Sequence, residues 1–290
     1  MPKIRANGIN FHYWQSGSGP HVVMTHGLGG NLAGWHLTLV PELQREYRVT
    51  TYDLRGHGRT DAPETGYTNR NMAEDLKGVM DALGIDRAHL VGHSWGGDIS
   101  LQFALLYPDR VRSLILVEAG LLGPLANEFR RRDWEGWAYV EKTLESLLGG
   151  PIPPEKRYDL EFLLTSLLDV PVQYGPSRGQ RRDERVVKRV MDVLMPMWKG
   201  EPADWELTLE SLSRLHHPTL LLYESSSIFL KSHDALRQRL VNSKSVILND
   251  GRAKESRIKH FTLMEIPEQL LGHTRTFLES EELETRQQRV

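Results

Sequence analysis

The chain has 290 residues, a mass of 33.2 kDa and a formal net charge of −2, from 36 Lys and Arg residues against 38 Asp and Glu residues. A charge this close to neutrality excludes a general electrostatic attraction to nucleic acid or to an anionic membrane, so any recognition of anions must be local. The absence of cysteine excludes disulfides, thiolate catalysis and zinc–thiolate sites, and it fits a reducing compartment.

The amino-terminal residues lack the long apolar segment of a secretory signal, and no later stretch approaches about 18 uninterrupted apolar residues. We therefore expect a soluble, cytoplasmic protein whose partners include neither a nucleic acid nor a membrane. The same residues predict a β-hairpin, because segments 3–6 and 9–15 flank Asn7-Gly8, a dipeptide whose two positions tolerate positive φ. This hairpin is expected to form an antiparallel edge of a sheet.

Short apolar runs along the rest of the chain predict buried parallel strands, since they are too short to be helices. These runs cover residues 21–27, 47–53, 88–94, 111–120, 217–225 and 244–250. Helical patterns separate or follow them over residues 72–83, 95–107 and 266–278, and the polar end beyond the last helix is expected to fray. The alternation predicts an α/β fold with a doubly wound, mostly parallel, eight-stranded sheet.

Residues 121–214 interrupt this alternation with mostly helical, strongly charged sequence that Pro and Gly residues punctuate. Residues 1–120 and 215–290 are therefore predicted to form one core, and the segment between them an inserted helical cap or lid. Aromatic residues of the insertion, among them Trp137 and Phe162, are candidates for an apolar substrate pocket. The alternative for any one of them is the cap's own core.

Residues 178–189 and 130–132 are locally basic. The default interpretation of such a stretch is a solvated helix face. The sharper hypothesis is a dock for an anionic substrate tail, a carrier protein or coenzyme A.

The segment LVGHSWGGDIS places a serine on a predicted strand-to-helix turn. Gly92, Ser94 and Gly96 match the pattern G-x-S-x-G, and a nucleophile on such a sharp turn projects its hydroxyl above the sheet. Only small residues fit beside it, because the backbone is crowded there. We identify Ser94 as a candidate nucleophile; the alternative is a glycine-rich turn whose serine performs no chemistry.

An acyl-transfer site also needs backbone N–H groups that stabilise an oxyanion. One is expected from Trp95, at the start of the helix after the nucleophile, where free N–H groups and the helix dipole coincide. The second is expected from the loop HGLGG after the strand at residues 21–27, with Leu28 as the donor. His26, in the same loop, is a further candidate for the substrate pocket.

His260 is the best candidate for the general base among the twelve histidines. It follows the last predicted strand, and the chain order for this kind of site is serine, acid, then histidine. His93 is expected to be a packing residue, and His57 lies in a loop that more naturally braces the site. His216 and His217 precede a strand and have no metal-ligand spacing.

Together, the motifs HGLGG, DLRGHGRT, GHSWGG, YPDRV and KHFTLMEIPE resemble the α/β-hydrolase superfamily, in particular its capped group of epoxide hydrolases, haloalkane dehalogenases, C–C bond hydrolases and esterases. The resemblance covers almost the whole chain except the insertion. It implies an α/β-hydrolase fold and, because serine stands at the nucleophile position where dehalogenases and epoxide hydrolases use aspartate, an acyl-enzyme intermediate.

The acid of the triad departs from the family pattern. In most relatives it follows the strand here at residues 217–225 in a G-x-x-D arrangement, but this chain has Glu224 and Ser227 at those two positions. Serine cannot supply the charge that stabilises an imidazolium. Glu118, at the end of the strand after the nucleophile strand, is the candidate acid, as in some members of the superfamily. Glu224 and Asp250 are the other candidates for the acid. The alternative for Glu118 is a structural role, either capping the start of the insertion or pairing with an arginine.

The sequence thus predicts a serine hydrolase that cleaves a carboxylic ester, lactone or thioester without a metal or organic cofactor. Acyl release or cyclisation of a polyketide-like chain and C–C bond hydrolysis are the alternatives within the enzyme class. A non-catalytic ligand receptor on the same fold is the alternative of another class. A small acyl molecule is the expected substrate, and coenzyme A or a carrier protein the possible thioester partner.

Overall fold

The computed structural model describes residues 2–166, 184–199, 206–249 and 262–287. The chain divides into two compact units, residues 1–121 with 205–290 and residues 122–204. Residues 206–214, which the sequence analysis assigned to the insertion, therefore belong to the first unit. The physical reason is burial: Leu207 and Leu212 are almost fully enclosed, and the Leu207 N–H donates to the Gln102 side chain at 3.0 Å.

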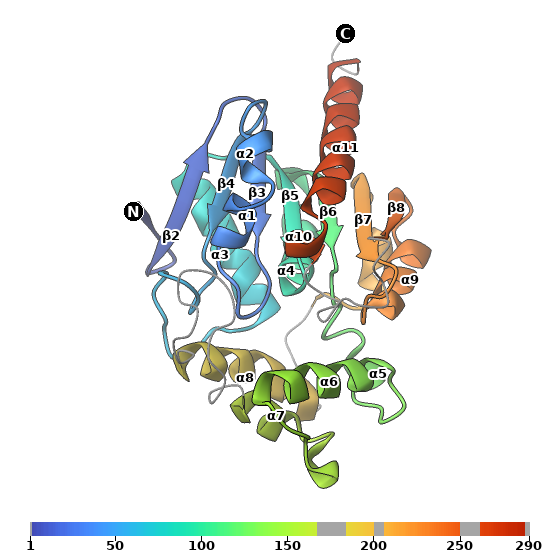
Figure 1. Ribbon diagram of the computed structural model, residues 1–290. Helices are drawn as coiled ribbons and strands as arrows, with labels where there is room; N and C mark the ends of the chain where they lie inside the picture. Colours follow the sequence, from blue (N-terminus) through green and yellow to red (C-terminus); the bar gives the residue numbers. More distant parts are fainter. Residues whose placement is uncertain (1, 167–183, 200–205, 250–261, 288–290) are drawn as a thin grey trace. The chain divides into compact units, whose positions relative to one another are not determined.

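The first unit is built on an eight-stranded sheet with the strand order β1-β2-β4-β3-β5-β6-β7-β8 (Figure 1). β1 pairs with β2 and β2 with β4 in antiparallel fashion, whereas all the other neighbours are parallel. The predicted doubly wound, mostly parallel sheet is confirmed. The strands are β1 (Lys3–Ala6), β2 (Ile9–Ser16), β3 (His21–Thr25), β4 (Arg48–Tyr52), β5 (Ala88–His93), β6 (Val111–Val117), β7 (Thr219–Glu224) and β8 (Ser243–Leu248).

The predicted hairpin joins β1 to β2. Asn7 and Gly8 both have positive φ, at 49° and 76°, the combination that a two-residue hairpin turn requires. The apolar runs that predicted buried strands fold as such because nearly all residues of β3, β5, β6 and β7 are buried. Each observed strand is one to three residues shorter than its run, since the flanking residues enter the loops.

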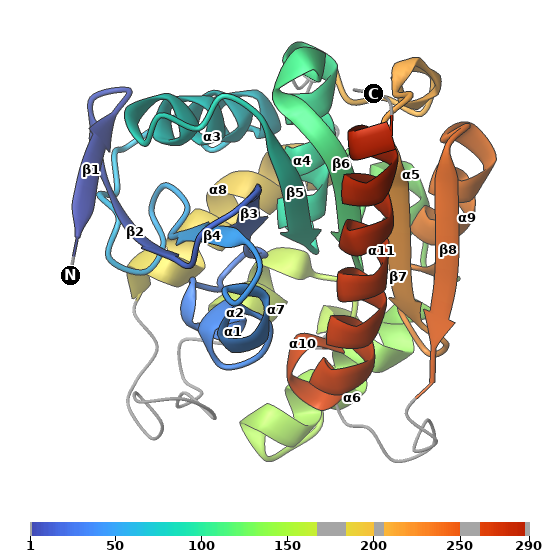
Figure 2. The same cartoon turned by 90° about the horizontal axis from the view of Figure 1, so that it is seen from above.

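Helices cover both faces of the sheet (Figure 2). α3 (Asn69–Ala82) and α4 (Trp95–Leu106) pack against each other on one face, and the short helices α1 (Ala33–His36) and α2 (Val40–Leu43) lie on the other with α10 (Thr262–Glu265) and α11 (Pro267–Gln287). α9 (Leu230–Arg239) packs against β7 and β8. In the part of the chain that the structure describes, no helix has the length and apolarity needed to cross a membrane.

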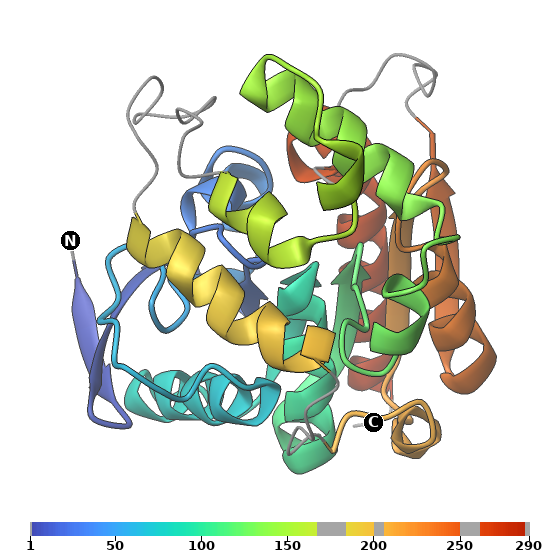
Figure 3. The same ribbon diagram turned by 90° about the horizontal axis from the view of Figure 1, so that it is seen from below.

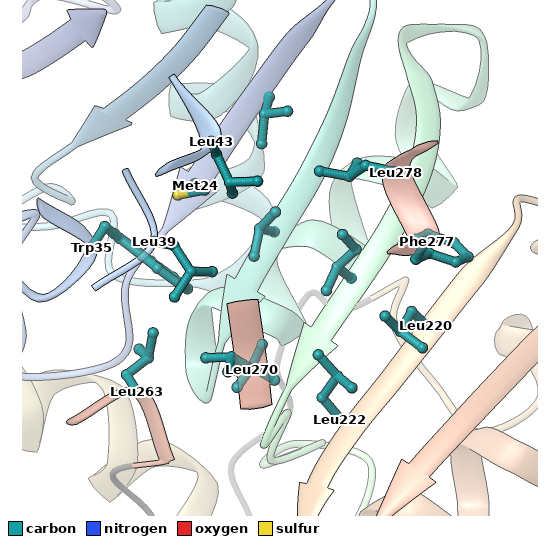
Figure 4. Close-up of a cluster of buried hydrophobic side chains, with 14 of the residues drawn as sticks. Met24, Trp35, Leu39, Leu43, Leu220, Leu222, Leu263, Leu270, Phe277 and Leu278 are labelled. Atoms are coloured by element: carbon teal, nitrogen blue, oxygen red, sulfur yellow. The ribbon is translucent and has the colours of Figure 1, made fainter. Parts of the chain in front are cut away.

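A large core cluster lies between the sheet and the layer of α1, α2, α10 and α11 (Figure 4). Trp35 of α1, Leu43 of α2 and Leu39, which directly precedes α2, join Leu270 and Leu278 from α11 over the apolar side chains of the strands. Close packing of these large side chains fixes the sheet, and therefore fixes the positions at which its strands end.

The expectation that the chain frays after residue 278 is wrong, because α11 continues to Gln287. Its polar last turns have partners in the sheet. Glu282 accepts hydrogen bonds from His89 Nε2 at 2.9 Å and from Arg112 Nη1 at 3.1 Å. A polar helix end is stable when its charges meet complementary groups, and the local sequence does not reveal those partners.

In its described residues the second unit contains the α-helices α5 (Ala126–Phe129), α6 (Gly136–Leu148), α7 (Leu160–Ser166) and α8 (Glu184–Lys199), drawn from green to yellow in Figure 3. It has an apolar cluster of its own, made of Trp137, Leu144, Ile152 and Leu163. The helical character predicted for this segment is therefore confirmed for its described residues. Its expected role as a cap over the nucleophile stays a prediction.

Candidate active site

Ser94 stands on a sharp turn between β5 and α4 with a φ of 54° and a ψ of −124°. Non-glycine residues rarely adopt this backbone conformation, and it persists only where the surroundings enforce it. The glycines around it are sterically required. A Cβ at Gly92 would lie 2.3 Å from the carbonyl oxygen of Gly96, and one at Gly96 would lie 2.2 Å from that of Thr25. The strained serine between obligatory glycines is the geometry of a nucleophile elbow.

The loop after β3 passes directly beside this serine. A Cβ added at Gly27 would lie 2.9 Å from the Cβ of Ser94, so only glycine fits there without displacement. Leu28 is the next residue, and Trp95 is the first residue of α4. The structure thus places the two expected oxyanion-hole residues on the two segments that flank the serine.

His26 braces this loop. Its Nε2 accepts a hydrogen bond from the Leu54 N–H at 3.0 Å, so its Nδ1 carries the proton and donates to the Gly27 carbonyl oxygen at 2.8 Å. Burial lowers the pKa of His26, which keeps the imidazole neutral. Both ring nitrogens are therefore bonded to backbone groups, which gives His26 a structural role; its expected place in the substrate pocket stays a prediction.

Two further side chains from the loop after β4 hold the same segment. The Gly29 N–H donates to His57 Nε2 at 3.1 Å, and the Leu32 N–H donates to Asp53 Oδ1 at 2.8 Å. These bonds give His57 the bracing position that its loop suggested. The expected oxyanion loop is consequently fixed before any substrate binds, which is what electrostatic stabilisation of a transition state requires.

Glu118 follows β6 immediately beside the nucleophile turn. The Ser94 N–H donates to the Val117 carbonyl oxygen at 2.9 Å, so the residues that end β5 and β6 are neighbours. The Glu118 side chain has no exposed surface, and its backbone φ is 53°. A carboxylate buried this completely is stable only when hydrogen bonds or opposite charge compensate the lost hydration.

The end of β7 supplies two of these hydrogen bonds. The Glu224 N–H donates to Glu118 Oε1 at 2.6 Å, and the Ser227 hydroxyl donates to Glu118 Oε2. Ser227 occupies the position of the aspartate that most relatives were expected to carry. The carboxylate of Glu118 therefore meets the segment in which the missing acid would have stood.

The backbone that carries Glu118 is held from three elements. The Leu121 N–H donates to Asp98 Oδ1 of α4 at 2.9 Å, and the Tyr223 hydroxyl of β7 donates to the Ala119 carbonyl oxygen at 2.7 Å. The Ser232 hydroxyl of α9 donates to the Gly120 carbonyl oxygen at 2.6 Å. Every described residue from 118 to 121 is thus anchored, which fixes the direction of the carboxylate. None of these anchors could be found in the sequence, because each joins segments that are distant along the chain.

Glu224, the first reserve for the acid, is also buried, and its Oε1 accepts a hydrogen bond from the Ser226 hydroxyl at 2.8 Å. Asp250, the second reserve, lies outside the described residues, as does His260, the expected base. Their roles stay predictions. His217 lies at the opposite end of the sheet, where its Nε2 donates to the Pro108 carbonyl oxygen at 2.9 Å.

The aromatic candidates for the substrate pocket belong to the interior of the second unit. Trp137 is buried, its indole N–H donates to the Arg131 carbonyl oxygen at 2.9 Å, and its ring contacts Tyr158 at a centroid distance of 5.3 Å. Phe162 packs against the same cluster. Both residues therefore pack in the unit's own core, the alternative left open for them, and their place in a substrate pocket stays a prediction. Trp95 is likewise buried, with its indole N–H donating to Asn69 Oδ1 at 2.6 Å.

Comparison with known proteins agrees with this geometry. The family described as alpha/beta hydrolase fold matches residues 20–144. An epoxide hydrolase 2 of Siraitia grosvenorii is 43% identical over 114 residues, which cover 39% of this chain and 36% of the relative. A 2-hydroxy-6-oxo-6-phenylhexa-2,4-dienoate hydrolase of Comamonas testosteroni is 38% identical over 148 residues, 47% of this chain and 50% of the relative.

The fold is shared over nearly the whole length with a solved structure described as an N-acyl homoserine lactone degrading enzyme. The TM-score is 0.65 at 27% identity, and the match covers 95% of this chain and 100% of that one. With the sheet topology and the serine turn, these matches show an α/β-hydrolase fold, and residues 20–144 match the family of that name. The aligned part spans only about a third to a half of the two curated relatives.

Proposed function

We propose that this protein is a serine hydrolase that cleaves a carboxylic ester, lactone or thioester through an acyl-enzyme. The observation that carries the proposal is the pairing of a strained serine turn with a rigid, fully buried carboxylate on the adjacent strand end. A buried acid that is this well anchored beside a candidate nucleophile is a feature of catalytic sites rather than of ordinary sheet edges.

In the proposed mechanism, the Ser94 hydroxyl attacks the acyl carbon while His260 accepts its proton. Backbone N–H groups of Leu28 and Trp95 stabilise the oxyanion, each contributing roughly 3 kcal/mol in comparable sites. His260 then returns the proton to the leaving group. In the second half of the reaction His260 accepts a proton from a water molecule that attacks the acyl carbon, and it returns that proton to the Ser94 oxygen as the acid leaves. The proposal requires no metal or organic cofactor.

Glu118 is proposed to orient the imidazole of His260 and to stabilise its protonated form. Ser227 is a positioning residue in this scheme. Its hydroxyl donates to one carboxylate oxygen of Glu118 and so holds the carboxylate in one orientation. The second oxygen is held by the Glu224 N–H. The carboxylate of Glu118 is thus restrained on both sides.

C–C bond hydrolysis is a second candidate, favoured by the relative from Comamonas testosteroni. Epoxide hydrolysis is disfavoured by Ser94, because the family resemblance implies aspartate as the nucleophile of that reaction. A turnover assay with a 4-nitrophenyl ester, a homoserine lactone, an acyl thioester and a 2-hydroxy-6-oxo dienoate separates these classes. Fast consumption of the dienoate alone would select C–C hydrolysis, and selective turnover of the thioester would select acyl release.

A thioester substrate implies coenzyme A or a carrier protein as the acyl donor. Such a donor is anionic, and the basic stretch 178–189 is its proposed dock, of which only the part within α8 lies in the described residues. Thioester turnover should then fall as salt rises, because salt screens exposed charges, while turnover of a small neutral ester stays constant. Equal salt dependence of the two substrates would argue against the dock.

Labelling with a fluorophosphonate probe tests the proposal directly. The unmodified protein should be labelled, Ser94→Ala should not, and Ser213→Ala should be labelled like the parent protein. Ser213 is a suitable control because it is exposed and its hydroxyl bonds only to the nearby Glu210 carbonyl oxygen among described residues. A folded parent protein that resists the probe would favour a non-catalytic receptor instead.

A further inference from the structure

The amino-terminal ends of β5, β6 and β7 surround an open cavity of about 500 Å³ in the first unit. Arg87 precedes β5, Arg112 is the second residue of β6, and Arg214 and His217 precede β7. Ser94 lies beyond the other end of β5. The six residues of that strand separate the two places by ~20 Å at about 3.3 Å per residue, so the cavity is not part of the candidate active site.

The cavity is lined mainly by cationic side chains. Three arginines, Arg87, Arg112 and Arg214, line it together with two histidines, His216 and His217, and one acidic residue, Asp109. Arg112 also pairs with Glu282 at 3.1 Å through Nη1, but Arg87 and Arg214 form no ion pair with any residue in the described ranges. Like charges gathered at one place repel each other, and a bound anion would relieve that repulsion.

Two buried nitrogens of the lining have no hydrogen-bond partner among the described residues. They are Nε of Arg112 and Nδ1 of His217. The Arg112 nitrogen is a donor. His217 donates to the Pro108 carbonyl oxygen through Nε2, so in the neutral imidazole Nδ1 is an acceptor. Buried polar atoms without partners are uncommon because they lose hydration without compensation. Two of them in the lining of one cavity therefore indicate a polar ligand.

This set of atoms distinguishes between kinds of anion. A carboxylate near neutral pH offers acceptors only and cannot satisfy the acceptor of His217. A phosphate group near neutrality has a second pKa of about 6, so it presents both anionic oxygens for guanidinium forks and a hydroxyl in its singly protonated form. It alone of the two can pair with Arg112 Nε and His217 Nδ1 together.

We propose that this cavity binds the phosphoryl group of a small phosphorylated molecule. Arg87 and Arg214 supply the charge at the open side, and Arg112 and His217 supply the directional contacts at the buried side. The site is independent of the proposed hydrolysis at Ser94, and either could be present without the other.

Isothermal titration with inorganic phosphate tests the proposal, with acetate at matched ionic strength as the carboxylate comparison. Phosphate should bind and acetate should not. Arg214→Ala and Arg87→Ala should each weaken phosphate binding by about tenfold or more, because a charge-assisted hydrogen bond contributes roughly that factor. Both residues are exposed, so these variants are expected to fold.

Arg5→Ala is the matched control, since Arg5 is exposed on β1, the edge strand at the far side of the sheet. It removes the same charge and should leave phosphate binding unchanged. Equal losses in Arg5→Ala and Arg214→Ala would show general electrostatics and overturn the proposal. So would equal binding of acetate and phosphate, or an absence of phosphate binding.

Discussion

At the scale of single residues, Glu118 combines a φ of 53° with a carboxylate that has no exposed surface. Each feature is unfavourable in isolation. Hydrogen bonds from the Glu224 N–H and the Ser227 hydroxyl offset the burial of the charge, and further hydrogen bonds hold the backbone at residues 119–121. A position maintained against two local costs is a strong candidate for a functional residue.

Replacing Ser227 tests whether its hydroxyl positions this carboxylate. Ser227→Ala should lower kcat for an ester substrate by about tenfold, since one charge-assisted hydrogen bond is lost, and should leave KM nearly unchanged. Steady-state kinetics measure both constants. A rise in KM with an unaltered kcat would assign Ser227 to substrate binding instead.

Returning an acid to position 227 is a sharper test of the same contact. In a protein that carries Glu118→Gln, the additional change Ser227→Asp should recover part of the lost kcat, because the new carboxylate stands beside the vacated one. The matched comparison is Ser226→Asp in the same Glu118→Gln background. The native Ser226 hydroxyl donates to Glu224 rather than to Glu118. Equal recovery from both changes would contradict the proposed geometry.

At the scale of elements, the site depends on how closely β5, α4 and the loop after β3 approach one another. Glycines at positions 27, 92 and 96 permit contacts that a Cβ would prevent. The loop is then tied to the segment after β4 by His26, His57 and Asp53. The nucleophile and the expected oxyanion loop are therefore parts of one rigid junction.

Gly96→Ala should destabilise this junction by on the order of 3 kcal/mol or more, because the added methyl group would collide with the Thr25 carbonyl oxygen. Gly272→Ala is the control in α11, where the added Cβ meets no atom within 4 Å. That change should stabilise the protein by about 0.5–1 kcal/mol through helix propensity. Urea unfolding compares the two, and similar free energies of unfolding would contradict the crowding at the turn.

At the scale of the whole molecule, several histidines are buried in the folded protein. Burial is the main cause that lowers the pKa of His26, His89 and His217 below the ordinary value of 6.5. The unfolded chain therefore binds more protons than the folded protein as the pH falls below about 6.5. The stability that neutral histidines provide is present above that pH and is lost as the pH falls toward their folded values.

The free energy of unfolding should accordingly decrease between pH 7 and pH 5, before most carboxylates titrate. Urea titrations across this range measure the slope. His26→Gln should flatten it, because the glutamine cannot take up a proton. A free energy of unfolding that is constant between pH 7 and pH 5, or that rises toward low pH, would contradict the conclusion that these histidines are buried in their neutral form.

Much of this architecture could be predicted from the sequence. The strands follow from short apolar runs, the hairpin from Asn7-Gly8, and the nucleophile turn from glycines at fixed spacing around Ser94. These signals are local. The length of α11 was missed because its polar end is stabilised by His89 and Arg112, which lie 193 and 170 residues before their partner Glu282.

The same reason explains what was missed at the site. The contact between Glu118 and Ser227 depends on the register of β6 against β7, which no local pattern encodes. The aromatic residues of the insertion could equally have lined a pocket or formed a core, and Trp137 belongs to a core because of its packing partners. Residue type alone leaves both a pocket and a core possible for such aromatic residues, and contacts between segments distant in the sequence determine which of the two forms.

Glu118 is proposed to be the acid of a serine triad, and the function proposed for this protein depends on that assignment. The most direct measurement is kcat for ester hydrolysis in Glu118→Gln compared with Glu224→Gln. We predict a loss on the order of 10⁴-fold for the first, as for the loss of a triad acid elsewhere, and a loss below about tenfold for the second. Comparable losses in the two variants, or a larger loss in Glu224→Gln, would contradict the account.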